Sequence, residues 1–216
     1  MTRLVLRTAG WIYGWRWLVL PPVVGALMLA MLVGAVVVAP REVVEGEVQR
    51  LMYIHVPSAI SGYFAFGVVF AASVGLLWTR DMRFDAVARG AATVGVLFTF
   101  MMLTTGAIWG KPIWGTYWAW DARITSTLIL FLLYTAYLLA RSLADEVDEQ
   151  AARYSAVYAI VAFLDIPIIN MSVRWWRTLH PQPIVVEGAL PMGMQLVLAL
   201  SMLAIVLLTV WLIVLR

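Results

Sequence analysis

Residues 192–215, Met-Gly-Met-Gln-Leu-Val-Leu-Ala-Leu-Ser-Met-Leu-Ala-Ile-Val-Leu-Leu-Thr-Val-Trp-Leu-Ile-Val-Leu, form an apolar run without a charged side chain. A helix that crosses a membrane needs about 20 mainly apolar residues, because each residue adds about 1.5 Å along the axis. Five further segments meet this criterion: 17–39, 58–78, 90–108, 124–140 and 154–170. The sequence therefore predicts an all-α polytopic membrane protein, one domain over residues 1–216 built as a bundle of six transmembrane helices.

The composition agrees with a chain that lies mostly in lipid. The protein has 216 residues, of which 63% are hydrophobic and 12% are charged, and its mean hydropathy is +0.91. Soluble domains have roughly 45–50% apolar and about 25% charged residues. A soluble enzyme, a disordered chain and a DNA-binding domain are therefore poor fits. The net charge of +3 is spread without a basic run, so we expect membrane lipid and no nucleic acid as a partner.

The distribution of basic residues predicts the orientation of the spans. With six spans both chain ends lie on one side, and nine of the 15 basic residues lie on that side, including Arg3, Arg7 and Arg16. The positive-inside rule then places both termini in the cytoplasm. The segment 17–39 is too long for the apolar part of a signal peptide, about 7–15 residues, so we expect it to be retained.

Metal or haem chemistry in this chain depends on two histidines. The sequence has no cysteine, which excludes thiolate ligands and covalent haem attachment through this chain. His55 and His180 are both predicted in outer loops, His55 just before Pro57 at the start of the second span and His180 ahead of the sixth. A single histidine near a helix end is more often an ordinary surface residue, so the pair is the informative observation.

Tryptophans gather on the same side as the histidines. Six of the eleven lie in the outer loops: Trp109, Trp114, Trp118, Trp120, Trp175 and Trp176. If residues 114–121 are helical, Trp114, Tyr117, Trp118 and Asp121 share one face, which would make an aromatic plate that ends in a carboxylate. An ordinary interfacial aromatic anchor is the alternative.

Three motifs carry a resemblance to a known family. Residues 114–123, Trp-Gly-Thr-Tyr-Trp-Ala-Trp-Asp-Ala-Arg, resemble the tryptophan-rich WWD motif of haem-handling membrane proteins, and here the motif occupies the loop 109–125. The stretches 49–57 (Gln-Arg-Leu-Met-Tyr-Ile-His-Val-Pro) and 172–180 (Ser-Val-Arg-Trp-Trp-Arg-Thr-Leu-His) add to it. Over essentially its whole length the chain is similar to the CcmC family of system I cytochrome c maturation.

The resemblance implies a function and partners. A CcmC protein is expected in the bacterial inner membrane, where it holds haem b non-covalently and transiently on the periplasmic face between two axial histidines and the WWD platform. It would deliver this haem to the haem chaperone CcmE and work with the ABC transporter subunits CcmA and CcmB and the small subunit CcmD. The resemblance implies delivery rather than catalysis, and leaves open a part in covalent attachment to the chaperone.

The residues themselves fit a flat apolar ligand that carries two carboxylates. His55 and His180 would be the axial ligands of the iron and Trp114, Trp118 and Trp120 the apolar platform. Arg50 and Arg123 lie inside the matched motifs, so we expect them to bind the haem propionates. Arg174 and Arg177 read as ordinary outer-leaflet charge. Asp121 is expected to orient Arg123 or an outer-loop amide rather than to bind iron.

Other interpretations remain open from the sequence. Asp165, inside the fifth span, is either a buried hydrogen-bonding group or part of a pocket wall, with Pro167 breaking the helix and Asn170 placed to satisfy a freed carbonyl. A membrane carrier that moves haem would need polar residues through several spans. A b-type electron-transfer subunit would place its histidines within spans.

Overall fold

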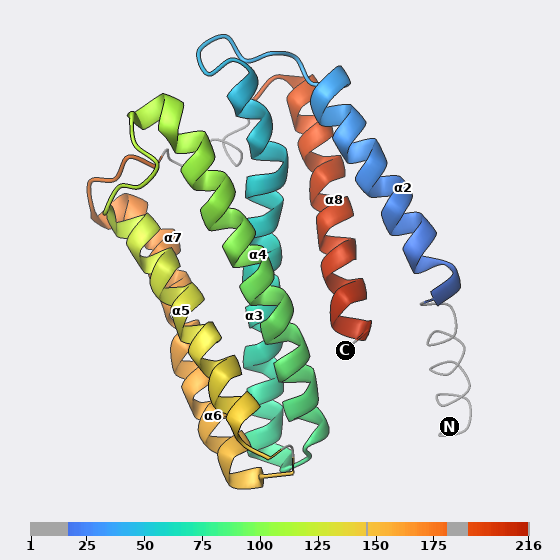
Figure 1. The fold of residues 1–216 in the computed structure, drawn as a ribbon, viewed down its shortest axis with the longest axis vertical. Coiled ribbons are helices and arrows are strands. Elements are labelled where there is room, and N and C mark those ends of the chain that lie inside the picture. Colours follow the sequence, from blue (N-terminus) through green and yellow to red (C-terminus); the bar gives the residue numbers. More distant parts are fainter. Residues whose placement is uncertain (1–16, 146, 181–189, 216) are drawn as a thin grey trace.

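The computed structural model describes residues 17–145, 147–180 and 190–215, and these residues fold as a helical bundle with no β-sheet (Figure 1). Two short helical turns, the π-helix Gly34–Val38 and the 3-10 helix Glu47–Leu51, flank the loop between the first two long helices. The α-helices are α2 (Leu20–Val33), α3 (Met52–Thr79), α4 (Arg83–Trp114), α5 (Ala122–Leu143), α6 (Glu149–Phe163), α7 (Asp165–Trp175) and α8 (Met192–Leu215).

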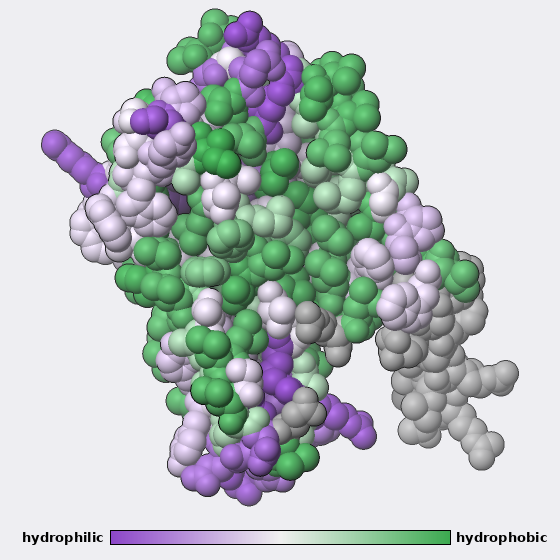
Figure 2. Space-filling model, in the orientation of Figure 1, coloured by the Kyte–Doolittle hydropathy of each residue, from purple (hydrophilic) through white to green (hydrophobic). Residues whose placement is uncertain are grey.

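The prediction of six spans is confirmed. Six helical segments of the described chain are long and apolar enough to cross a membrane, and α6 together with α7 makes one of them. Apolar side chains cover the middle of the face seen in Figure 2, whereas hydrophilic side chains gather towards its two ends. Four of the arginines used to predict orientation, Arg3, Arg7, Arg16 and Arg216, lie outside the described residues.

Helix α3 is the centre of the bundle. It packs against α4, α6 and α8, while α2 lies against α8 and α5 lies against α4, α6 and α7 (Figure 1). Phe66 of α3 stacks on Tyr134 of α5 with 3.8 Å between ring centroids and 11° between planes. A side chain at Gly95 of α4 would collide with the Phe66 ring. The absence of a side chain there lets α3 and α4 approach, and these helices carry much of the site described below.

The fifth span is broken at Leu164, between α6 and α7. Pro167 has no backbone N–H and therefore cannot donate to the carbonyl four residues before it, at Phe163. The Asn170 side chain donates to the Ile166 carbonyl at 2.9 Å, so an amide side chain does satisfy a carbonyl beside the break. Asp165, the first residue of α7, has a buried Oδ2 without a hydrogen-bond partner among the described residues.

Four of the six spans are longer than predicted, among them α3 and α4, and the loops are correspondingly shorter. The 3-10 turn 47–51 leads directly into α3 at Met52, so the prediction that His55 lies in a loop is wrong: it lies in the first turn of a helix that tolerates Pro57 near its start. Helix α4 continues beyond the predicted end at residue 108 to Trp114. Hydropathy reports which residues are apolar, whereas a helix continues as long as its backbone hydrogen bonds do.

Candidate functional site

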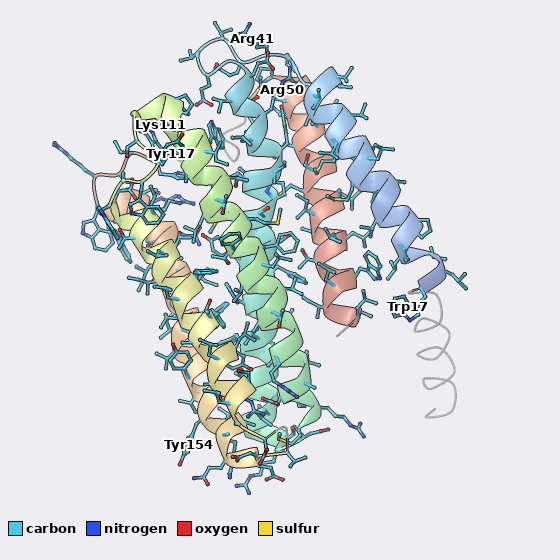
Figure 3. The ribbon with its side chains drawn as sticks, viewed as in Figure 1. Trp17, Arg41, Arg50, Lys111, Tyr117 and Tyr154 are labelled. Atoms are coloured by element: carbon cyan, nitrogen blue, oxygen red, sulfur yellow. The ribbon has the colours of Figure 1, made fainter. Side chains whose placement is uncertain are left out.

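The site lies at one end of the bundle, here called the histidine end because it carries His55 and His180. Four segments meet there: the start of α3, the last turns of α4, the loop 115–121, and residues 176–180 after α7 (Figure 1). Lys111 and Tyr117 mark this end in Figure 3, where the Lys111 ammonium lies 5.2 Å from the centre of the Tyr117 ring. Both histidines are therefore positioned by elements far apart in sequence.

His55 is oriented by a hydroxyl group of α4. Its Nδ1 lies 3.1 Å from Thr105 Oγ1, and this hydroxyl in turn donates to the Met101 carbonyl at 2.7 Å. A hydroxyl has one hydrogen, so Oγ1 accepts from His55 and the neutral imidazole carries its proton on Nδ1. The lone pair is then on Nε2, the form in which histidine binds a metal.

The His55 ring is also held by its neighbours. A Cβ atom at Gly106 would lie 2.9 Å from the imidazole Cε1, so only glycine leaves room for the ring against α4. Trp109 meets the ring edge to face, with centroids 5.7 Å apart and planes at 81°. The Trp109 indole N–H donates to Glu45 at 2.9 Å, which ties this contact to the loop before α3. His55 is thus a rigid side chain.

Residues 114–121 do not form the helix on which the shared aromatic face would depend. Helix α4 ends at Trp114 because Gly115 takes a left-handed conformation with φ 76°, and its N–H bonds to the Lys111 carbonyl at 3.0 Å. Residues 116–120 are not helical, and Asp121 starts the next helix by accepting from the Ile124 N–H at 2.9 Å. Trp114 and Asp121 therefore do not share one helix face.

The tryptophans of the motif lie in different surroundings. Trp114 folds back over Gly110, where an added Cβ would lie 2.7 Å from the indole. Trp118 and Trp120 pack edge to face with centroids 5.6 Å apart. Trp120 is 78% exposed, whereas the Trp118 indole N–H is buried and has no hydrogen-bond partner among the described residues. The loop therefore offers one exposed indole and one buried donor side by side.

Asp121 joins the tryptophan loop to the segment that carries His180. Its Oδ2 accepts from the Thr178 hydroxyl at 2.6 Å and from the Leu179 N–H at 3.1 Å. The same Thr178 oxygen accepts from the His180 N–H at 3.1 Å. One of the two partners expected for Asp121, an outer-loop amide, is present. Asp121 and Thr178 together fix the backbone at His180.

Thr178 was not among the residues predicted from the sequence. A threonine two residues before an important side chain is typical of a turn in which the hydroxyl accepts from a following backbone N–H. That signal was available at Thr178 and His180 but is common in loops. Thr105 and Gly106 were missed as well, because only the packing of α3 on α4 brings them to His55.

The two arginines expected to bind propionates differ in what surrounds them. Arg123 lies beside the Tyr63 hydroxyl and, like His180, is close enough to His55 to act on it electrostatically. The Arg50 Nε pairs with Glu47 at 2.6 Å, and its Nη1 donates to the carbonyls of Ala35 and Ala39. Figure 3 shows Arg50 at the end of α3 near α2. Of these two arginines, Arg123 is the one that lies near the histidines.

The remaining charged residues follow the sequence expectations to different degrees. Arg174 and Arg177 are exposed, as ordinary surface charge would be. Asp165 is near enough to Tyr63 to interact with it electrostatically, and Arg123 lies near the same tyrosine. In the described part of the chain no three His, Cys, Asp or Glu side chains cluster as a metal site would require. A macrocycle that already binds its metal through four nitrogens needs no such cluster, because imidazoles can supply its remaining ligands.

The hydrogen bonds to Asp121 have an electrostatic consequence. Burial alone would raise the pKa of Asp121, but donation from the Ile124 amide, the Thr178 hydroxyl and the Leu179 amide outweighs this, and the positive charge of His180 adds to it. The pKa of Asp121 is therefore held below its usual 3.8. The ionised carboxylate is the form that stabilises the loop pairing.

We expect Asp121→Asn to lower the thermal unfolding midpoint of the purified protein at about pH 7, because the charged acceptor is lost. A carboxyl with a depressed pKa contributes stability that is present above its unfolded pKa and lost as the pH falls through the folded value. The difference between the parent and the variant should therefore shrink from about pH 7 to about pH 3. Asp145→Asn, at an exposed position at the other end of the bundle, is the control. Equal midpoints at neutral pH would contradict the role of Asp121.

Comparisons with known proteins show the family of this chain. The model of the family described as CcmC, Heme exporter protein C, matches residues 4–216. The chain is 40% identical to a "Heme exporter protein C" of Bradyrhizobium diazoefficiens over 87% of this chain and 72% of that protein. It is 38% identical to the "Heme exporter protein C" of Escherichia coli K12, over 82% of this chain and 63% of that protein.

A plant protein is similar as well. The chain is 41% identical to a "Putative cytochrome c biosynthesis ccmC-like mitochondrial protein" of Marchantia polymorpha over 66% of this chain and 60% of that protein. The chain thus spans between 60% and 72% of the length of these three relatives. The family model covers all but the first three residues, including both histidines and the tryptophan loop. This chain belongs to the CcmC, heme exporter protein C, family.

Proposed function

We propose that this protein holds haem at the histidine end of the bundle, non-covalently and with His55 and His180 as axial ligands, and passes it to a haem chaperone. Family membership implies a role in haem handling for cytochrome c biogenesis and in delivery rather than catalysis. The observation that carries the more detailed proposal is the orientation of His55, whose Nδ1 faces the Thr105 hydroxyl and leaves Nε2 for the iron.

The surroundings of the histidines support haem b as the cargo. Haem is flat and apolar with two carboxylates at one edge, and the site combines indole rings with a guanidinium group beside Tyr63. The buried N–H of Trp118, which lacks a partner among the described residues, is a donor for an oxygen of the cargo. We assign Trp114, Trp118 and Trp120 to the platform and Arg123 to a propionate. Arg50 stays a weaker candidate for a propionate because two of its nitrogens are occupied.

We infer the partners and the location from the family. A chain that delivers haem needs a recipient, and we propose the chaperone CcmE, with CcmA, CcmB and CcmD as the other members of the complex. The basic residues on the side of the chain ends favour an inner-membrane protein with cytoplasmic termini and a periplasmic histidine end. The exposed Trp120 gives the chaperone a surface to approach.

Two other functions fit less well. A b-type electron-transfer subunit would hold both ligands within spans, and although His55 lies in α3, His180 follows the end of α7. A membrane carrier for haem would need a polar route through the bundle, to which Asp165, with its buried Oδ2, contributes a single ionisable group. Haem transport into vesicles by this chain alone would favour the carrier over delivery.

Replacing either axial ligand should weaken haem binding. We expect His55→Ala and His180→Ala to lose most of the haem that co-purifies with the parent and to change its Soret spectrum, because each removes one iron ligand. Arg174→Ala, an exposed change near His180, is the control and should keep the parent's haem. Unchanged haem content and spectrum in both histidine variants would show that the axial assignment is wrong.

The hydroxyl that orients His55 should matter almost as much as a ligand. Groups that orient metal ligands typically contribute 10–100-fold to affinity, so we expect Thr105→Val to weaken haem retention by about tenfold and Thr105→Ser to restore it. Thr104→Val is a matched control, because the Thr104 hydroxyl is exposed and bonds to the Phe100 carbonyl instead. If Thr105→Val and Thr104→Val retain haem equally, Thr105 does not orient the ligand.

Delivery can be separated from binding. We expect the double variant Trp118→Ala and Asp121→Ala to insert in the membrane but to stop loading of the chaperone, since it removes the buried indole and the tie to His180. Trp78→Ala, at an indole 86% exposed near the other end of α3, is the control. Covalent haem on co-expressed CcmE is the measurement, and normal loading by the double variant would rule out the platform.

A further inference from the structure

The opposite end of the bundle contains a buried ion pair that the haem-handling function does not use. Asp85 of α4 is 1% exposed and Arg141 of α5 is 3% exposed. The guanidinium binds the carboxylate through two hydrogen bonds, Nη2 to Oδ2 at 2.9 Å and Nε to Oδ1 at 3.2 Å. This two-point geometry leaves the third nitrogen of Arg141, Nη1, available to another acceptor.

A second guanidinium shares the same carboxylate. Arg89, one helical turn after Asp85, has its Nε 3.0 Å from Asp85 Oδ2. Two guanidinium groups therefore lie beside this carboxylate, and the side chains of Asp85 and Arg141 are removed from water.

A hollow lies next to this cluster between α4 and α5. Its volume is about 360 Å³. It is lined by Arg89, Gly90 and Thr93 of α4 and by Leu138, Arg141 and Ser142 of α5. Arg141 Nη1 is buried and makes no hydrogen bond with any described residue. A buried donor on the wall of a hollow indicates a ligand that accepts hydrogen bonds.

The other polar groups of the hollow do not compete for this role. The Thr93 hydroxyl donates to the Arg89 carbonyl at 2.9 Å and the Ser142 hydroxyl donates to the Leu139 carbonyl at 2.8 Å. Each hydroxyl has used its hydrogen within its own helix. The donor that remains is the guanidinium, so the hollow selects an anion rather than a neutral polar group.

We propose that this hollow binds the phosphate of an acidic phospholipid. Ser142 and Ala86 are exposed, so the hollow opens at the surface of the bundle. Gly90 and Leu138, which line the same hollow, lie further into the span than Arg89 and Arg141, and the start of an acyl chain can lie against them. Hydrophilic side chains gather at this end and apolar ones above it (Figure 2). In that setting the abundant anion is a lipid headgroup, and basic pockets between transmembrane helices bind such groups.

The purified full-length protein tests the proposal. It is mixed with equal amounts of phosphatidylglycerol and phosphatidylcholine, and retained lipid is measured by native mass spectrometry. We expect phosphatidylglycerol to be retained about tenfold better, because guanidinium pairing favours the anionic headgroup. Equal retention of the two lipids would overturn the proposal. A second experiment measures the thermal unfolding midpoint of the protein with inorganic phosphate and with phosphatidylglycerol. If inorganic phosphate raises the midpoint as much as phosphatidylglycerol does, the lipid is not the source of the anion.

Variants of the lining separate this site from general attraction to lipid. Ser142→Asp places a carboxylate in the hollow and leaves Asp85 and Arg141 in place. It should abolish the preference, so that phosphatidylglycerol and phosphatidylcholine are retained about equally. Ser142→Asn, of similar shape and no charge, should retain the preference. Arg141→Lys is the second variant should Ser142→Asp fail to fold; it keeps the charge and loses Nη1, and should lower the preference as well. An unchanged preference in the folded aspartate or lysine variant would overturn the assignment.

Discussion

The Asp121 carboxylate is the interaction on which the geometry of the histidine end depends. It begins α5 by accepting from the Ile124 amide, and through its other oxygen it holds Thr178 and Leu179. The segment after α7 is thereby fixed to the tryptophan loop, and the His180 backbone is bonded to the same threonine. A carboxylate with three donors in one place serves as the junction of two helix ends, which explains an acidic residue directly after a row of tryptophans.

The general fold was predictable because the membrane imposes a simple rule on the sequence. A segment that crosses the lipid must be mainly apolar along its whole length, so six runs such as 192–215 could be predicted as spans. All six are helices long and apolar enough to cross a membrane. The ends of the helices were not predictable in the same way. Helix α4 ends where Gly115 adopts a left-handed conformation, six residues beyond the predicted boundary. One residue and one backbone hydrogen bond decide this, and hydropathy does not detect them.

The site was predictable in its residue types and less so in its geometry. A chain without cysteine and with two histidines leaves few candidates, and the motif around Trp118 indicated where they meet. Thr105 and Gly106 act on His55 only through the packing of α3 on α4, which no local pattern reveals. Arg50 lies in a matched motif, yet it binds the carbonyls at the end of the first span. A motif identifies a position, whereas tertiary contacts decide what its side chain does.

The two histidines belong to different kinds of structure, one to a helix and one to a loop. His55 belongs to a helix and is held by a hydroxyl, an indole and a glycine surface of the neighbouring helix. His180 belongs to a loop, where its backbone N–H bonds to the Thr178 oxygen and Thr178 in turn bonds to the Asp121 carboxylate. If loop residues move more readily than a packed helix, the site opens first on the side of His180. Cargo would then leave in a defined direction, from the His180 side, while His55 keeps its place ready for the next load.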